Sequence, residues 1–246
     1  MRLRLSVVSV SDCGKVREEN QDHVLVDARR GLFCVADGMG GGEGGAVASR
    51  IVCDKLRKTV SGFLRFGTRR ARIESALSAA NRSVRDYAAK QGFDHMGSTA
   101  AVLSIERGAV GTICHIGDSR VYRLRSGELA LLTDDHTIGG ELNRTVRNDS
   151  SASVADRSHP LAHVLTRSIG GKDEVAPEWK EVEVAVGDRY LICSDGLHDV
   201  LSDSKIRELL SVGDLAGVRN GLSAEIERCG APDNYSFVVI DVEAAK

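Results

Sequence analysis

The chain has 246 residues, of which 42% are apolar and 28% charged, a composition typical of a soluble globular protein with one large or two small domains. A formal net charge of −2 argues against nucleic acid or an anionic membrane surface as the main partner. No apolar run approaches the roughly 20 residues of a membrane helix, and six scattered cysteines without a Cys-x-x-Cys pair favour a reduced, cytoplasmic setting.

The first part of the chain predicts three strands followed by two helices. The strands are expected at residues 2–10, 23–28 and 32–37. The first of them is a strand rather than a secretion signal, because its apolar residues alternate and its apolar stretch is short. Apolar residues then recur at helical spacing over 47–60 and 73–87, and Gly92 ends the second helix.

Strands return after these helices, and a polar segment interrupts them. Further strands are predicted at residues 98–106, 109–117, 120–125, 129–133, 179–186, 189–196 and 235–242. Residues 134–157 are polar and aperiodic, which indicates a surface insertion rather than a domain boundary, because strands resume after it. A helix is expected over 205–228. This order, without regular strand–helix–strand alternation, predicts an α+β protein with antiparallel sheets and helices stacked outside them.

The glycine-rich segment "ADGMGGGEGGAVASR" satisfies several nucleotide-binding patterns. Gly40, Gly42 and Gly45 match G-x-G-x-x-G, but no acidic residue follows where the ribose of a dinucleotide should be held. The glycine loop of protein kinases also matches, yet no H-R-D, D-F-G or V-A-I-K motif follows. A P-loop is excluded because Ala46 and Val47 stand where Lys and Ser or Thr are required. The glycines therefore do not predict a nucleotide site.

Acidic residues stand where four predicted strands end or begin. Asp37, Asp118 and Asp195 each follow an apolar strand, and Asp233 closely precedes the last one. If the strands are neighbours, these carboxylates converge, and they cannot all stay ionised without a cation between them. Oxygen ligands alone select Mg²⁺ or Mn²⁺, and two such ions would activate a water for attack on phosphorus. Gly38 would let its carbonyl serve as a further ligand. The alternative, that each aspartate is a turn or helix cap, stays open on spacing alone.

The ordered motifs of the chain resemble those of one known family. The motifs are "REENQD", "VADGMGG", "MGSTA", "HIGDSR", "LTDDH", "HVLTRSIG", "CSDGLHDVLSD" and "DNYSFVVI". They are similar to those of the PP2C, or PPM, family of metal-dependent protein serine/threonine phosphatases, in its compact bacterial form. They follow the family order from about residue 5 to residue 242, so the resemblance covers nearly the whole chain.

The resemblance implies a four-layer α/β/β/α sandwich, in which two antiparallel sheets are flanked by helices. It implies a single phosphatase domain over residues 1–246. The polar segment at about 134–160 would be an inserted flap beside the active site.

The resemblance also implies the ligands of a metal centre that uses Mn²⁺ or Mg²⁺. Asp37 would bridge two ions, and the carbonyl of Gly38 would bind one of them. Asp195 and Asp233 would hold the other ion. Asp118 together with Asp195 would form a weaker third site.

Two further residues have catalytic roles by the same resemblance. Arg17 would bind the substrate phosphate, and Asp22 would support the water held by the metals. Two cations and a guanidinium suit a phosphate dianion, and the nucleophile would be a metal-bound hydroxide rather than a side chain. Cys34 and Cys193 lie inside strands without a basic loop after them, which argues against tyrosine-phosphatase chemistry.

The chain departs from the family in the loop after Asp37. Many relatives have a histidine there, proposed as the acid that protonates the leaving group, whereas this chain has Met39 and Gly42. The acid could be a metal-bound water or a histidine such as His136 or His159. Each of these histidines is also compatible with an ordinary flap residue, and the acid stays unassigned.

The expected function is therefore hydrolysis of phosphoserine and phosphothreonine in proteins by a metal-activated water, opposing a bacterial Hanks-type Ser/Thr kinase. The alternative from another class is a non-catalytic phosphoprotein-binding module with the same fold. A metal phosphoesterase for small molecules or nucleic acid is disfavoured because no basic or aromatic groove is evident. We expect a monomer that uses neither nucleic acid nor a membrane as partner. The sequence does not identify the phosphoprotein substrate.

Overall fold

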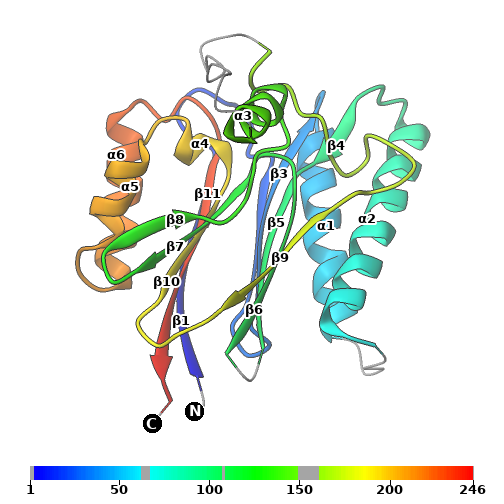
Figure 1. Ribbon diagram of the computed structural model, residues 1–246. Coiled ribbons are helices and arrows are strands. Elements are labelled where there is room, and N and C mark those ends of the chain that lie inside the picture. The colour runs from blue at the N-terminus through cyan, green and yellow to red at the C-terminus, as the bar shows by residue number, and fades with distance from the viewer. Residues whose placement is uncertain (1–2, 62–66, 107–108, 149–160, 246) are drawn as a thin grey trace.

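The computed structural model describes residues 3–61, 67–106, 109–148 and 161–245 of the chain. Two antiparallel β-sheets pack face to face, and helices cover the outer face of each sheet, so that the molecule has four layers (Figure 1). The α/β/β/α fold class predicted above is confirmed. Among the described residues, no helix combines the length and the apolar character needed to cross a membrane.

Each sheet draws its strands from distant parts of the chain. The first sheet has the order β1-β11-β10-β7-β8. Its strands are β1 (Leu3–Asp12), β7 (Arg120–Arg125), β8 (Glu128–Leu131), β10 (Arg189–Cys193) and β11 (Tyr235–Ala244). The second sheet has the order β2-β3-β5-β6-β9, and β4 pairs with the end of β3. Its strands are β2 (Asp22–Asp27), β3 (Leu32–Gly40), β4 (Met96–Ser98), β5 (Ala100–Glu106), β6 (Val110–Ile116) and β9 (Glu178–Glu183).

The helices form the two outer layers. The second sheet is covered by α1 (Gly44–Ser61) and α2 (Arg69–Gln91), and the first by α4 (Asp195–His198), α5 (Asp203–Leu210) and α6 (Leu215–Arg228). The helix α3 (Ile138–Asn148) lies at one end of the sandwich, away from the chain termini (Figure 1). As predicted, α2 ends at Gly92, which adopts the left-handed conformation with φ 74°.

The central strands read as continuous apolar runs because both of their faces are buried. In β3, Phe33 and Val35 point between the two sheets, whereas Cys34 and Ala36 point toward α1 and α2. The alternation follows from the two-residue period of a strand, and each side meets an apolar layer. The strand β11 alternates in the same way between the other sheet and the helices α4 to α6.

Phe237 allows a direct test of this packing. Its side chain is fully buried in β11 and belongs to the core beneath α4 to α6. Phe237→Ala removes most of the ring and leaves a cavity, so the free energy of unfolding should fall by about 3–5 kcal/mol. Urea unfolding followed by circular dichroism measures this loss. Val212→Ala, at a side chain 64% exposed, is the control and should change stability by less than about 0.5 kcal/mol. A loss no larger than that of the control would contradict this description of the core.

The prediction of one helix over 205–228 is wrong, because the structure has α5 and α6 with a break between them. Gly213 sits in the break with φ 74°, a left-handed conformation that favours glycine. Asp214 then caps α6 by accepting a hydrogen bond from the Gly217 amide at 2.8 Å. The apolar period continues across the break, and for this reason periodicity alone did not reveal it.

Two short elements also differ from expectation. The strand predicted over 189–196 ends at Cys193, and Asp195 begins the short helix α4 instead. Part of the segment predicted to be aperiodic forms α3. Thr137 favours the start of this helix, because its hydroxyl accepts a hydrogen bond from the Gly140 amide at 3.0 Å. Residues 149–160 of the predicted flap lie outside the described residues.

Candidate active site

A cleft of about 680 Å³ opens at the end of the sandwich that carries α3 and α4. The structure brings six of the seven predicted site residues to its lining. They are Arg17, Asp37, Gly38, Asp118, Asp195 and Asp233. The seventh, Asp22, is buried directly behind them and stands opposite Asp37 in the pairing of β2 with β3. Residues spread over more than 200 positions thus share one site.

Asp37 lies inside β3 rather than after it, and Thr99 holds both its amide and its carbonyl. Its amide donates to the Thr99 hydroxyl at 2.9 Å, and its carbonyl accepts from the Thr99 amide at 2.8 Å. The pKa of Asp37 is raised well above its usual range, because the carboxylate is withdrawn from water and faces the charges of Asp22 and Asp195. A carboxylate in this setting favours a proton or a cation beside it.

Gly38 is required by the close approach of two backbone segments. A Cβ at this position would lie 2.0 Å from the Gly45 carbonyl oxygen and 2.6 Å from that of Gln21. The Gly38 amide donates to the carbonyl of Gln21 at 3.1 Å. This bond joins the residue before β2 to the end of β3. The glycine-rich segment therefore allows α1 to begin directly against the strand that carries Asp37.

Gly38→Ala should damage this arrangement, since the clashing atoms belong to the backbone and cannot turn away. We expect a loss of about 1–3 kcal/mol in the free energy of unfolding, as for other overpacked sites. Thermal and urea unfolding of the metal-free protein measure it. Gly41→Ala is the matched control, because a Cβ there meets nothing within 4 Å. Equal stability of the two variants would count against the close approach.

Asp22 is a buried carboxylate whose hydrogen bonds are incomplete. Its Oδ2 atom accepts from the Ser194 hydroxyl at 2.7 Å, and that hydroxyl in turn accepts from the Ser236 amide at 2.9 Å. Its Oδ1 atom has no hydrogen-bond partner among the described residues. Burial raises the pKa of Asp22 to about 7, although the serine hydrogen bonds oppose this effect. A buried oxygen without a partner points to a proton, a water or an ion at that place.

Asp118 and Asp195 complete the carboxylate cluster. Burial raises the pKa of Asp118 well above its usual range, and the charge of Asp195 adds to the effect. The pKa of Asp195 is also raised, chiefly by burial. The ring of His198, in α4, lies with its Nε2 atom 3.1 Å from the backbone carbonyl oxygen of Asp118. This contact ties α4 to the loop between β6 and β7.

Arg17 and Asp233 form an ion pair at the cleft, with 2.7 Å between Nη2 and Oδ2. The hydrogen bond to Asp233 raises the pKa of the Arg17 guanidinium. Asn234 holds the segment that carries Arg17, because its Nδ2 atom donates to the carbonyls of Cys13 and Glu19 at 2.8 and 2.9 Å. The Arg17 side chain is 58% exposed. Its guanidinium is therefore open to an anion as well as paired with Asp233.

The donor set fits hard divalent cations. Several buried carboxylates have raised pKa values because each faces the charges of others, and a shared cation removes that repulsion. The lining of the cleft gives oxygen donors, and the Asp22 Oδ1 atom lacks a partner in the part of the chain that the structure describes. The backbone at Gly38 reaches the site without a side chain in the way. This chemistry matches Mn²⁺ or Mg²⁺.

A second group of possible ligands does not fit a metal. His115, His136 and Glu178 have potential ligand atoms within 4.8 Å of one another. The Gly117 amide donates to Nδ1 of His136 at 3.2 Å, which occupies that nitrogen, and Nε2 of the same ring lies 3.3 Å from the Arg167 guanidinium. The positive charge of a guanidinium at that nitrogen disfavours a metal cation there. The two histidine rings instead stack at 4.4 Å and brace the loop before Asp118.

The structure describes only one of the two histidines considered above as the acid. His136 is 1% exposed and does not line the cleft, and burial lowers its pKa to about 4, so near neutrality its ring is not the imidazolium that a general acid requires. His159 lies outside the described residues. A third histidine, His163, does line the cleft, and its Nδ1 atom lies 3.6 Å from Asp199.

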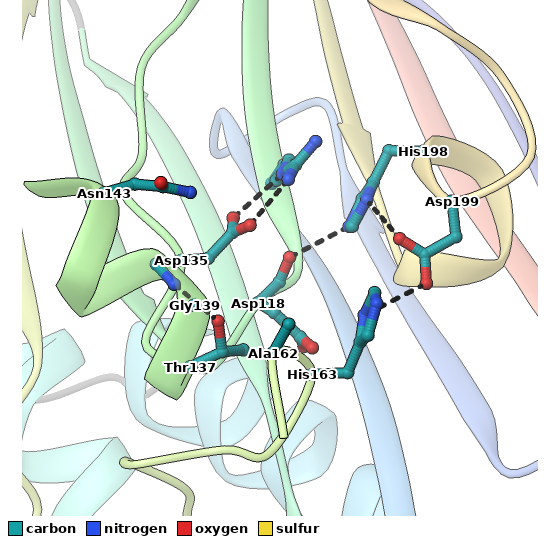
Figure 2. Close-up of a pocket in the computed structure, with 11 residues that line it drawn as sticks. Asp118, Asp135, Thr137, Gly139, Asn143, Ala162, His163, His198 and Asp199 are labelled. Carbon is teal, nitrogen blue, oxygen red and sulfur yellow. Dashed lines mark hydrogen bonds and ion pairs between the residues drawn. The ribbon is translucent and has the colours of Figure 1, made fainter. Parts of the chain in front are cut away.

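Figure 2 shows a smaller cavity of about 40 Å³ beside the cleft, with Asp118 in the lining of both. His198 reaches from the Asp118 carbonyl toward Asp199, and His163 approaches the same Asp199 carboxylate from the other side. Asp135 lies across the cavity and forms a two-pronged ion pair with Arg120. The cavity is thus walled by fixed charges next to the carboxylate cluster.

Sequence reasoning missed the residues that hold the aspartates in place. Thr99, Ser194 and Asn234 fix Asp37, Asp22 and the Arg17 segment, respectively. All three stand in or beside the motifs quoted above, but a lone polar residue carries no periodic signal. His163 was also missed for this reason.

The chain is similar to known proteins in both sequence and fold. The family model for Protein phosphatase 2C matches residues 13–224. The serine/threonine protein phosphatase PstP of Mycobacterium tuberculosis is 36% identical over 241 residues, which cover 98% of this chain and 45% of PstP. This chain thus spans less than half of that relative. The protein phosphatase PhpP of Streptococcus pneumoniae is 30% identical over 97% of this chain and 98% of its own. The crystal structure of the PstP catalytic domain in complex with two manganese ions superimposes with a TM-score of 0.85 at 34% identity, covering 98% of this chain and all of that one.

Proposed function

The chain belongs to the protein phosphatase 2C family, and on that premise we propose that it is a metal-dependent phosphatase for phosphoserine and phosphothreonine in proteins. One observation carries the proposal. Asp37, Asp118, Asp195 and Asp233 reach a single cleft together with Arg17. The named relatives are protein phosphatases, and a related catalytic domain binds two manganese ions.

We propose the following ligands for the metal centre. Asp37 and the carbonyl of Gly38 would hold one ion, and Asp37 with Asp195 and Asp233 would hold a second. Asp118 with Asp195 would serve a third, weaker site. When bound, Mn²⁺ or Mg²⁺ would supply Lewis-acid polarisation of the phosphate and an activated water.

The protein's own groups would orient the substrate and hold protons. The Arg17 guanidinium offers two parallel donors to a phosphate, and its exposure at the cleft leaves them accessible. Asp22 can hold a proton at Oδ1, because its pKa is raised to about 7 and no other described residue bonds that atom. Thr99 and Ser194 keep the carboxylates oriented while charge builds on the phosphate.

The alternative of a non-catalytic binding module is not favoured. Such a module has no need of a crowded carboxylate cluster, which destabilises the fold unless cations bind there. The complete set of aspartates and Arg17 therefore supports an enzyme.

The test is hydrolysis of p-nitrophenyl phosphate and of a phosphothreonine peptide by the purified chain. We expect both activities with Mn²⁺, loss of both on addition of EDTA, and recovery when Mn²⁺ is restored. Turnover that persists in excess EDTA would overturn the proposal. So would the absence of any turnover in a chain that binds Mn²⁺ by calorimetry.

The partners and the setting are also proposals. We infer that the substrates are proteins phosphorylated by a Ser/Thr kinase, including the kinase itself, and that the phosphatase acts as a monomer. Six free cysteines, four of them buried, support a reducing, cytoplasmic setting. The proposed flap would comprise about residues 134–160 of a single domain.

A further inference from the structure

Beside the carboxylates, the cleft has an apolar wall formed by Met39, Val164 and Leu165. Met39 is 36% exposed and Val164 is 44% exposed, so apolar surface faces the solvent within a site that is otherwise polar. Apolar surface that remains exposed in a binding cleft commonly marks a contact with a ligand or partner.

The strand β4 lies between the two parts of the apolar wall, Met39 on β3 and the segment that runs from Val164 to Ile169. A Cβ on Gly97 of β4 would lie 2.8 Å from the Met39 Cε atom and 2.9 Å from the carbonyl oxygen of Ile169. Ser98 and Ile169 also exchange two backbone hydrogen bonds, of 2.9 and 2.8 Å. Met39 therefore lies on the far side of Gly97 from Ser168 and Ile169, a few residues along the chain from Val164 and Leu165.

The cleft also has an acidic wall, formed by Glu18 and Glu19. Both side chains are exposed, and neither forms an ion pair with another described residue. The backbone beneath them is fixed, because Asn234 holds the Glu19 carbonyl at 2.9 Å. The Glu19 carboxylate accepts only a long hydrogen bond from Gln21 Nε2, at 3.5 Å, so both exposed carboxylates can meet a cationic side chain.

The two walls lie on opposite sides of the strand that carries Asp37. On one edge of β3, the Gly38 amide donates to the carbonyl of Gln21, which continues from the acidic wall. On the other edge, Gly38 pairs with Ser98 of β4, which supports the apolar wall. Because the two contacts lie on the two edges of β3, a ligand centred over Asp37 has the acidic wall on one side and the apolar wall on the other.

We propose that this cleft selects phosphopeptides in which the phosphorylated residue stands between a Lys or Arg on one side and a bulky apolar residue on the other. The inference rests on the phosphatase function proposed above. With the phosphate at Arg17 and the carboxylate cluster, an extended peptide advances about 3.3 Å per residue. Side chains one or two positions away then reach the acidic wall in one direction and the apolar wall in the other.

The experiment compares kcat/KM for a small set of phosphothreonine peptides with Mn²⁺ present. The parent peptides place Arg before and Leu after the phosphothreonine, or the reverse, since the structure does not fix the chain direction. In matched peptides Leu becomes Ser, or Arg becomes Glu. We expect one parent to be preferred, with a roughly tenfold loss for Leu to Ser. We also expect a loss for Arg to Glu that shrinks as salt is raised.

Two double variants assign these preferences to the walls. In Met39→Ser/Val164→Ser the ratio of rates for the Leu and Ser peptides should fall to about one, while the preference for Arg over Glu stays. In Glu18→Lys/Glu19→Lys the preference for Arg over Glu should reverse. Ratios measured on one preparation do not depend on the fraction of protein that is folded. Val212→Ser and Glu128→Lys, at exposed positions outside the cleft, are matched controls and should keep both ratios.

The outcomes separate this inference from the proposed function. Equal hydrolysis of every peptide, or ratios unchanged in both double variants, would overturn the inference and leave the phosphatase function standing. Failure to hydrolyse any phosphopeptide with Mn²⁺ would overturn the function itself.

Discussion

Asp37→Asn is expected to lower kcat/KM for p-nitrophenyl phosphate by about a thousandfold or more. Asn keeps the size of the side chain but removes the charge at the point where the other carboxylates converge. The loss of one preorganised electrostatic group in an active site typically costs about 10²–10³ in rate, and a residue shared by two cations should lie at or above that range. Steady-state kinetics at saturating Mn²⁺ measure the effect.

The control for this experiment is Asp86→Asn, at an exposed position of α2 far from the cleft. It should retain the activity of the unmodified chain. The fold of Asp37→Asn should survive, because the substitution relieves repulsion among buried carboxylates rather than removing a favourable contact. If Asp37→Asn kept more than about a tenth of the activity, the assignment of Asp37 as the shared ligand would be wrong.

Removal of metal should make the stability of the protein fall as pH rises above neutrality. The pKa values of Asp22, Asp37 and Asp118 are raised in the folded state, by burial first and by the other carboxylates second. A group with a raised folded pKa stabilises the fold at low pH, and this stability is lost as pH rises toward the folded pKa. Each proton that the folded state holds in excess of the unfolded state costs about 1.4 kcal/mol per pH unit.

Between about pH 7 and pH 8, the pH dependence of the free energy of unfolding reports these carboxylates without the buried histidines. At lower pH the buried histidines act in the opposite sense. Burial lowers the pKa values of His23, His115 and His136, which makes stability rise with pH up to about 6.5. Urea unfolding in EDTA across this window measures the carboxylate effect alone.

Saturating Mn²⁺ should abolish the decline, because the cation replaces the protons between the carboxylates. A Mn²⁺ concentration a thousand times the dissociation constant should raise the free energy of unfolding by about 4 kcal/mol. Asp37→Asn should flatten the pH dependence in EDTA, and Asp86→Asn should not. Stability that is constant or rising from pH 7 to pH 8 in EDTA would show that the folded state holds no extra proton on these carboxylates near neutrality, contrary to the raised pKa of Asp22.

The fold class could be predicted because β3 and β11 are buried on both faces, and each therefore appears in the sequence as a continuous apolar run. The number of helices near the end of the chain could not, since the apolar period passes through Gly213 without interruption. The left-handed conformation of Gly213 ends the helical geometry there, even though the apolar spacing on both sides is that of one helix. The short helix at Asp195 was also hidden by the strand that precedes it.

The candidate site divides in the same way. Asp37, Asp118 and Asp195 stand out because each interrupts or follows an apolar run, which is a local signal. The residues that hold the site residues in position form hydrogen bonds with them from distant parts of the sequence. Ser194 bonds Asp22 from 172 positions away, and Asn234 bonds the Glu19 carbonyl from 215 positions away. Such pairs are set by the packing of the two sheets, so no single stretch of sequence indicates them. The metal-binding roles of the aspartates stay predictions until the kinetics above are measured.

The pairing of β1 with β11 has a consequence for how the molecule comes into being. These strands lie near the two ends of the chain, yet they are hydrogen-bonded along their whole length, from Leu3 opposite Ala244 to Asp12 opposite Tyr235. Since β11 lies between β1 and β10, a nascent chain on the ribosome that lacks β11 leaves β1 without a neighbour and Arg17 without Asp233. Contacts this distant along the chain form late and slowly. Catalytic competence should thus arrive only after β11 has been synthesised, and translation products that stop before β11 should be inert rather than uncontrolled phosphatases.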